Sequence, residues 1–138
     1  MLTAAALQSI LDEVAAEYVK RLGLRVDAVD QDSVSLNLPV TADLVHGGGV
    51  LCGQAIMAAA DTAMLVAMIG RLGGFRPMTT VQMQTSFLRP VANDVESVSL
   101  VSRVLRLGKT LSYGEVAFST PDGRLAAHAT MTYSLIRA

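Results

Sequence analysis

The feature that most constrains the fold is an apolar stretch from Ala55 to Ile69 that carries one charged side chain, Asp61, near its middle. A helix that is apolar on all sides is enclosed by other structure or lies in a membrane. A membrane span needs about 20 uninterrupted apolar residues, and this stretch is shorter and interrupted. The sequence therefore predicts a helix over Val50–Ile69, ending at Gly70, that the rest of the fold covers.

Before this stretch, apolar residues from Leu7 to Leu22 recur at helical spacing, with Thr3 placed to cap the start and Gly23 placed to end the helix. From Leu24 the apolar period changes to two, which predicts a strand that ends at Pro39. We therefore expect one amphipathic helix followed by one strand.

After the apolar stretch come four segments with the pattern of strands, at about 79–89, 95–107, 111–120 and 124–136. Turn residues separate them, among them Gly108-Lys109 and Pro121-Asp122-Gly123. The order of elements predicts an α+β fold in which a curved antiparallel sheet wraps around one long central helix. One sheet leaves part of an apolar helix exposed, so we expect a second subunit to cover it.

The length of 138 residues is that of one domain, which we place at 1–138, with an N-terminal helix over 1–23 and a core over 24–138. The net charge of −1 gives no indication of a nucleic-acid or membrane partner. Residues 71–138 nevertheless hold eight basic and four acidic side chains, so that half can bind an anion. The chain has one cysteine and no signal-peptide pattern, so we expect a cytoplasmic protein.

Asp61 is the first candidate for chemistry. An ionised carboxylate in an apolar helix is costly unless it is paired or used. It is either a structural aspartate, hydrogen-bonded to its surroundings, or a general base or nucleophile.

Glycine residues before the helix are the second candidate. Gly47-Gly48-Gly49 and Gly53 lie where the helix is expected to begin, and free N–H groups at a helix N-terminus can hold a negatively charged oxygen. Because loops before helices are often rich in glycine, turn formation alone explains them equally well.

These residues form a recognisable pattern. His46-Gly47-Gly48-Gly49-Val50-Leu51-Cys52-Gly53-Gln54, Asp61-Thr62-Ala63, Phe87-Leu88-Arg89-Pro90 and Gly108-Lys109-Thr110 resemble the hotdog-fold acyl-CoA thioesterases of the phenylacetate-pathway (PaaI-like) type, over about residues 24 to 136. The resemblance implies hydrolysis of an aromatic or medium-chain acyl-CoA to the free acid and CoA.

The resemblance also implies roles for individual residues. Gly53 aligns with the glycine whose N–H polarises the thioester carbonyl, Asp61 with the carboxylate that activates water or attacks directly, and Thr80 with a serine or threonine beside the site. His46, which can position water, stands where the family has asparagine, and Cys52 stands where it has histidine. The positions expected to bind substrate are Cys52, Gln54, Met57, Phe87, Leu88, Arg89, Pro90, Arg106, Gly108, Lys109 and Thr110.

The spacing of Gly53 and Asp61 adds a constraint. They are eight residues apart on one helix, or about 12 Å, whereas both must approach the same reacting carbon. Two antiparallel helices related by a twofold axis remove the conflict. We therefore expect a homodimer with shared active sites, and the resemblance adds that many relatives pair such dimers into homotetramers.

Two alternatives stay open. A hydroxyacyl-thioester dehydratase of the same fold would pair a histidine with a helical acid, although its acid would align with the neutral Gln54. A non-catalytic module that binds acyl-CoA would keep Asp61 for structure alone. We expect no metal and no cofactor, with coenzyme A entering only as part of the substrate, since two distant histidines and one cysteine make no recognisable ligand set.

Overall fold

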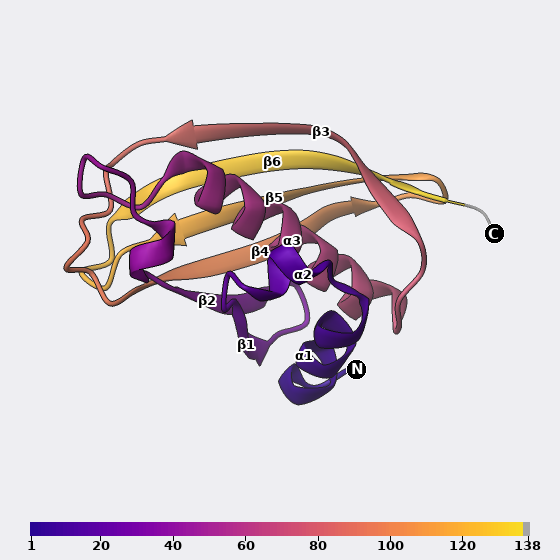
Figure 1. Ribbon diagram of the computed structural model, residues 1–138. Coiled ribbons are helices and arrows are strands. Elements are labelled where there is room, and N and C mark those ends of the chain that lie inside the picture. The colour runs from indigo at the N-terminus through magenta and orange to yellow at the C-terminus, as the bar shows by residue number, and fades with distance from the viewer. Residues whose placement is uncertain (137–138) are drawn as a thin grey trace.

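The computed structural model describes residues 1–136, in which six strands form one antiparallel sheet that curves around a long helix (Figure 1). The strand order is β1-β2-β4-β5-β6-β3. The predicted α+β arrangement, a sheet wrapped around a central helix, is confirmed. The elements are α1 (Ala4–Val14), α2 (Glu17–Lys20), β1 (Arg25–Val29), β2 (Val34–Pro39), a 3-10 turn (Ala42–Leu44), α3 (Gly53–Leu72), β3 (Met78–Phe87), β4 (Ser97–Leu107), β5 (Leu111–Ser119) and β6 (Leu125–Leu135).

Helix α3 begins and ends three residues later than the sequence predicted. Cys52 caps its start, where Sγ accepts a hydrogen bond from the Ala55 N–H at 3.4 Å, and Gly73 ends it in the left-handed conformation, with φ of 78°. Gly70 therefore lies inside the helix, and a Cβ added there would lie 3.8 Å from Leu7 Cδ1. By length and composition α3 could cross a membrane, but the sheet and the N-terminal helices bury most of it.

The predicted N-terminal helix is in fact two helices. Thr3 caps α1 as expected, but the backbone at Ala15 and Ala16 is extended, and α2 sets off in a new direction. Tyr18, which the helical period places with the apolar residues, is 60% exposed, whereas Leu22 is buried. No proline or glycine marks this break in the sequence.

The predicted single strand between Leu24 and Pro39 is also two elements. Strands β1 and β2 form a hairpin that pairs Val29 with Val34, and its turn carries Asp30 and Asp32. In β2 the alternate residues Val34, Leu36 and Leu38 are buried against α3, as the period of two predicted. Strand β1 is mostly exposed, and its weak alternation explains why the hairpin was missed.

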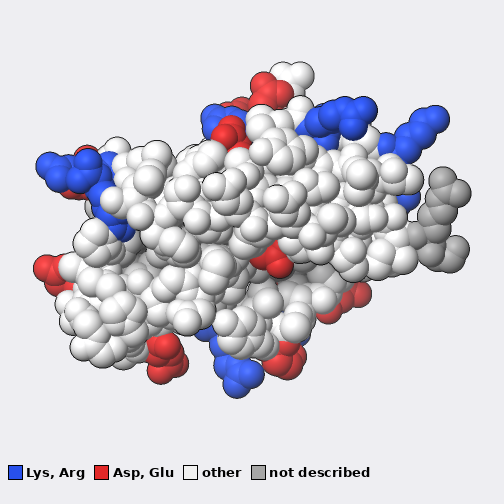
Figure 2. Space-filling model, turned by 90° about the horizontal axis from the view of Figure 1, so that it is seen from above, with Lys and Arg blue, Asp and Glu red and all other residues white. Residues whose placement is uncertain are grey.

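The two edges of the sheet differ in their protection. At one edge, the side chain of Gln8 in α1 accepts a hydrogen bond from the Val26 N–H of β1 at 2.8 Å. At the other edge, β3 runs for 10 residues without a charged side chain and is largely exposed. Figure 2, which views the molecule from above, shows a broad uncharged surface here. Exposed edge strands usually carry charged side chains or a cover, which prevents pairing with another chain. Strand β3 carries no charged side chain, so its edge is open to pairing.

Candidate functional site

The Asp61 carboxylate lies against two hydroxyl groups from neighbouring strands. Thr80 Oγ1 of β3 donates to Asp61 Oδ1 at 2.6 Å, and Tyr133 Oη of β6 donates to the same oxygen at 2.6 Å. Tyr133 Oη also lies 2.5 Å from the main-chain oxygen of Asp61. Asp61 is only partly buried, so its carboxylate is fixed in place while remaining open to a ligand.

A β-bulge at Val81 makes this arrangement possible. Thr80 pairs with Tyr133 and Met83 pairs with Met131, so one extra residue is inserted in β3 between them. In a regular strand, residues 80 and 83 would face opposite sides of the sheet. The bulge turns Thr80 toward α3 while Met83 still faces the interior.

Tyr133 is the site residue that the sequence reasoning missed. The alternation of apolar residues in the last strand places Tyr133 on its apolar face, and it is indeed 4% exposed. Burial, followed by the adjacent negative charge of Asp61, holds the pKa of the Tyr133 phenol far above its usual value, so the hydroxyl stays protonated. A usable signal was present, because a tyrosine on a buried strand face needs a partner for its hydroxyl.

Gly53 lies at the start of α3, eight positions before Asp61. As the first residue of α3, its N–H is among those with no acceptor inside the helix. A cavity of about 320 Å³ adjoins it, and a Cβ at Gly53 would lie 3.3 Å from the ring of Phe87. The cavity is lined by Val50, Leu51, Gly53, Ile56 and residues 87–91, so it includes the predicted segment Phe87-Leu88-Arg89-Pro90.

Four other predicted residues lie in or near the first turns of α3. Cys52 caps α3, Gln54 is exposed in its first turn, and Met57 is 39% exposed one turn further on. His46 lies in the preceding loop, where its Nδ1 accepts a hydrogen bond from the Gly48 N–H at 2.8 Å. None of the hydrogen bonds among residues 1–136 joins His46 to Asp61.

The β4–β5 turn, with Gly108, Lys109 and Thr110, lies on the side of the Asp61 carboxylate and away from the start of α3. Strand pairing sets Leu111 and Thr79 on either side of Ser134, one residue from Tyr133, whereas Phe87 pairs with Ala127. Seven residues of β6 separate Ala127 from Ser134, or about 23 Å. In Figure 1 the β4–β5 turn lies at the right and the start of α3 at the left.

One chain therefore holds two separate groups of predicted site residues. The carboxylate group comprises Asp61, Thr80 and Tyr133, with the β4–β5 turn beside it. The helix-start group comprises Gly53, Phe87 and the cavity between them. The structure does not bring Gly53 and Asp61 of the same chain together, since they are eight positions apart on α3.

Comparison with known proteins gives the family. The sequence profile of the thioesterase superfamily matches residues 48–127, which is more than half of the chain. The chain belongs to the thioesterase superfamily. The matched part begins in the glycine loop, spans α3 and β3 to β5, and reaches the first residues of β6.

Individual relatives agree with this membership. A candidate esterase of Thermoplasma volcanium is 28% identical over 129 residues, which cover 88% of this chain and 89% of the relative. A thioesterase from Haemophilus influenzae superposes with a TM-score of 0.83 at 22% identity, covering 99% of this chain and 92% of that one. The PaaI protein from the phenylacetic acid degradation operon of E. coli superposes at 0.81 with 18% identity, covering 98% and 96%.

These matches establish the hotdog fold that the resemblance implied. Membership of the thioesterase superfamily, together with relatives named as esterases, indicates a thioester hydrolase in general terms. At 18% identity the likeness to PaaI concerns the fold alone.

Metal-binding side chains do not gather in either group of this thioesterase-superfamily chain. Within residues 1–136, no three His, Cys, Asp or Glu side chains lie close enough to hold a metal ion. His128 of β6 is half-buried, and its Nε2 lies 2.9 Å from Glu115 Oε1.

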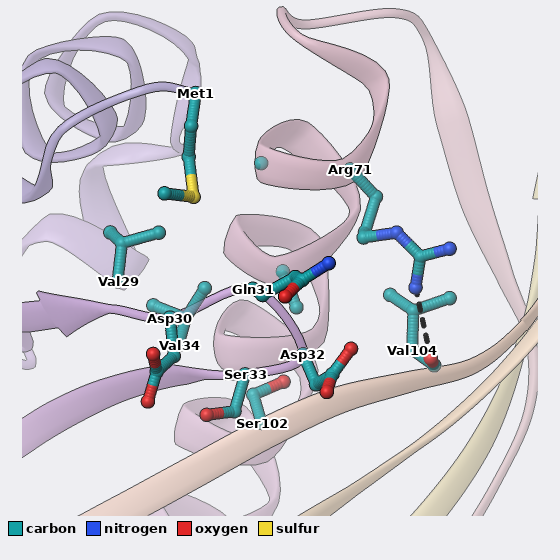
Figure 3. Close-up of a pocket in the computed structure, with 12 residues that line it drawn as sticks. Met1, Val29, Asp30, Gln31, Asp32, Ser33, Val34, Arg71, Ser102 and Val104 are labelled. Atoms are coloured by element: carbon teal, nitrogen blue, oxygen red, sulfur yellow. Dashed lines mark hydrogen bonds between the residues drawn. The ribbon is translucent and has the colours of Figure 1, made fainter.

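A second cavity, of about 40 Å³, lies beside the C-terminal half of α3 (Figure 3). The β1–β2 turn lines one side of it, and Arg71, whose Nη1 donates to the Val104 oxygen at 3.2 Å, lines another. Ser102 also lines it, and its buried Oγ has no protein partner, so the cavity suits an ordered water molecule. Arg71 is ten residues beyond Asp61, about 15 Å along the helix, so this cavity is separate from both site groups.

Proposed function

We propose that the protein hydrolyses acyl-CoA thioesters, in the manner of the PaaI-like type, at sites shared by two subunits. The observation that carries the proposal is the Asp61 carboxylate, which is fixed by Thr80 and Tyr133 yet remains partly exposed. Its counterpart is the first turn of α3, where the Gly53 N–H adjoins an apolar cavity. Together they supply a base or nucleophile and a donor for a developing oxyanion.

Pairing of two β3 strands at the open edge of the sheet would create the shared site. With a twofold axis near Met83 and Gln84, antiparallel pairing would set the Thr80 end of one strand beside the Phe87 end of its partner. Asp61 contacts Thr80, and Gly53 lies against Phe87. This pairing therefore brings the carboxylate of one subunit toward the helix start of the other, twice per dimer.

In the proposed reaction, water attacks the thioester carbonyl carbon and gives a proton to the Asp61 carboxylate. The carbonyl electron pair moves to its oxygen, where the partner's Gly53 N–H holds the negative charge. The intermediate then collapses, the C–S bond breaks, and the departing thiolate takes the proton from Asp61. Thr80 and the partner's His46 position the water; this histidine does so through Nε2, since its Nδ1 accepts a hydrogen bond from the Gly48 N–H.

Asp61 can also attack the carbonyl carbon itself and expel CoA thiolate, leaving a mixed anhydride that water then hydrolyses. A single turnover with excess enzyme in ¹⁸O-labelled water detects the anhydride route when water attacks the aspartyl carbon. General-base catalysis puts the label in the product acid during the first turnover. Attack of water on the aspartyl carbon of the anhydride puts the label in Asp61 instead, and mass spectrometry of its peptide detects it.

The CoA portion has candidate partners in both subunits. Arg89 lies at the cavity beside Gly53, and the partner's β4–β5 turn would bring Arg106 and Lys109 to the same site. Guanidinium and ammonium groups suit the phosphates of CoA. Apolar side chains dominate the cavity wall, which suits a medium aliphatic or an aromatic acyl group.

The deciding experiment measures thiol release from a panel of acyl-CoAs, including phenylacetyl and benzoyl esters, by the wild type and by Asp61→Asn. We expect the variant to lose at least about a hundredfold in kcat with the dimer intact. Undiminished hydrolysis would refute the proposal. Tight binding of acyl-CoA without thiol release would favour a binding module, and formation of an enoyl product from a 3-hydroxyacyl-CoA without thiol release would favour the dehydratase.

A further inference from the structure

The hydrogen bonds of the Asp61 carboxylate are unevenly distributed. Thr80 and Tyr133 both donate to Oδ1, each at 2.6 Å. Within residues 1–136, no hydrogen bond of the structure uses Oδ2. One carboxylate oxygen is thus held by the protein, and the other is free for a ligand.

The Tyr133 phenol has the properties of a permanent donor. Its side chain is buried beneath α3, and burial together with the Asp61 charge raises its pKa, so the hydroxyl keeps its proton. Its oxygen also lies 2.5 Å from the main-chain oxygen of Asp61, so the one phenol proton is shared between that carbonyl and Oδ1, and both contacts hold the ring against the helix.

We propose that Tyr133 is a positioning residue that, together with Thr80, commits Oδ1 of Asp61 to the protein and leaves Oδ2 as the reacting oxygen. This inference rests on the proposed thioester hydrolysis and names the atom that performs it. Tyr133 itself acts through Asp61 and does not touch the substrate.

The arrangement has a mechanical consequence. A carboxylate on a helix can rotate about its χ angles, and two donors on one oxygen select a single orientation. Thr80 is exposed on the open edge strand, whereas Tyr133 is buried, so the tyrosine supplies the rigid anchor. Loss of the phenol hydroxyl should therefore affect the chemical step more than substrate binding.

The test compares Tyr133→Phe with Tyr113→Phe, a matched control on the outer face of β5, where the side chain is 42% exposed. The dependence of kcat and KM on pH is measured for both with one good acyl-CoA substrate. Asp61→Asn is assayed alongside, and gel filtration and melting temperature report on the assembly and folding of every variant.

For Tyr133→Phe we expect kcat to fall about ten- to a hundredfold, the effect of a hydrogen bond to a charged group, with KM changed less than about twofold. The acid limb of the pH profile should move to higher pH, because the ionised carboxylate loses a donor that favours it. Tyr113→Phe should match the wild type. A purely structural role for Tyr133 would lower the melting temperature and leave the acid limb in place.

Two results would overturn the inference in distinguishable ways. If Asp61→Asn is inactive while Tyr133→Phe keeps the wild-type kcat and acid limb, the positioning role is wrong and the proposed function stands. If Asp61→Asn remains active, the proposed function fails and the inference fails with it.

A variant that retains the hydroxyl covers the case in which Tyr133→Phe does not fold. Because the chain has three tyrosines, the double variant Tyr18→Phe/Tyr113→Phe leaves Tyr133 as the one site for incorporated 3-fluorotyrosine. The fluorinated phenol is a stronger donor, so the acid limb should move to lower pH, opposite to Tyr133→Phe. An unchanged acid limb in this protein would contradict the inference.

Discussion

The ring of Phe87 packs so closely over Gly53 that a Cβ added at Gly53 would lie 3.3 Å from ring atom Cε1. Gly53 is the first residue of α3, a position that accepts proline because its N–H has no helical acceptor. The preceding Cys52, with φ of −71° and ψ of 149°, already has the conformation that a following proline requires. Gly53→Pro can therefore delete the proposed oxyanion donor without breaking the helix.

We expect Gly53→Pro to lower kcat about a hundred- to a thousandfold, the usual effect of losing one oxyanion donor. Gly53→Ala is the matched control, since it adds the Cβ near Phe87 but keeps the N–H, and it should retain most of the activity. Steady-state thiol release measures both. Equal activity of the two variants would show that the Gly53 N–H does not stabilise the transition state.

Mixing two inactive variants tests whether the active site is shared. In a heterodimer of Asp61→Asn with Gly53→Pro, one site receives an intact Gly53 from the first protomer and an intact Asp61 from the second. Random mixing makes half of the dimers mixed, each with one good site of two, so about a quarter of wild-type activity should return. Co-expression followed by thiol-release assays measures the recovery, and none would occur if each chain built its own site.

The β4–β5 turn should recognise the phosphates of CoA. Arg106→Ala/Lys109→Ala should raise KM for an acyl-CoA about tenfold while leaving hydrolysis of the same acyl group on N-acetylcysteamine, which lacks the nucleotide, unchanged. Lys20→Ala, which removes a cation from α2, serves as the control. An equal effect on both thioesters would mean that the turn acts on the chemistry or on folding and does not bind phosphate.

The raised pKa of the Tyr133 phenol should make stability depend on alkaline pH. In the unfolded chain a tyrosine ionises near pH 10, whereas folded Tyr133 keeps its proton. Its contribution is therefore complete below about pH 10 and is lost as the pH rises from there toward the folded pKa. Urea unfolding from pH 8 to 11 should show the wild type losing its advantage over Tyr133→Phe above about pH 10. Parallel pH curves would contradict the burial of a neutral phenol.

Gly114 should be irreplaceable for packing. A Cβ there would lie 2.6 Å from the Arg103 main-chain oxygen and 2.7 Å from Met64 Cε, and the backbone oxygen cannot move aside cheaply. We expect Gly114→Ala to destabilise the fold by about 1–3 kcal/mol, measured by chemical unfolding. Gly74→Ala, where a Cβ meets nothing within 4 Å, is the control and should be close to neutral.

The elements with strong periodicity were those that the sequence predicted well. Strands β3 to β6 lie within about two residues of their predicted bounds, because buried alternate positions and turn residues mark both their faces and their ends. The break at Ala15-Ala16 and the β1–β2 hairpin were missed, since no proline or glycine marks the break and the mostly exposed β1 lacks a clear alternation.

The sequence also did not predict which side chains on the Asp61 face of α3 are buried. The helical period puts Met57, Met64 and Met68 on the side of Asp61, but Met64 and Met68 are fully buried whereas Met57 is 39% exposed. A helical period gives direction around the axis and not which part of the helix the sheet covers. The face is therefore partly core and partly open surface beside the helix start.

The sequence alone determined that a charged carboxylate would stand in an enclosed helix, eight residues from a glycine at the helix start, because these are properties of spacing along one chain. Only the tertiary structure decided that Tyr133 would share Oδ1 with Thr80 and that β3 would lie at an open edge. The strand pairing of β3 with β6 and the bulge at Val81 bring residues far apart in sequence into contact. Such contacts depend on the pairing of strands that no single turn connects, so a local pattern of residues does not reveal them.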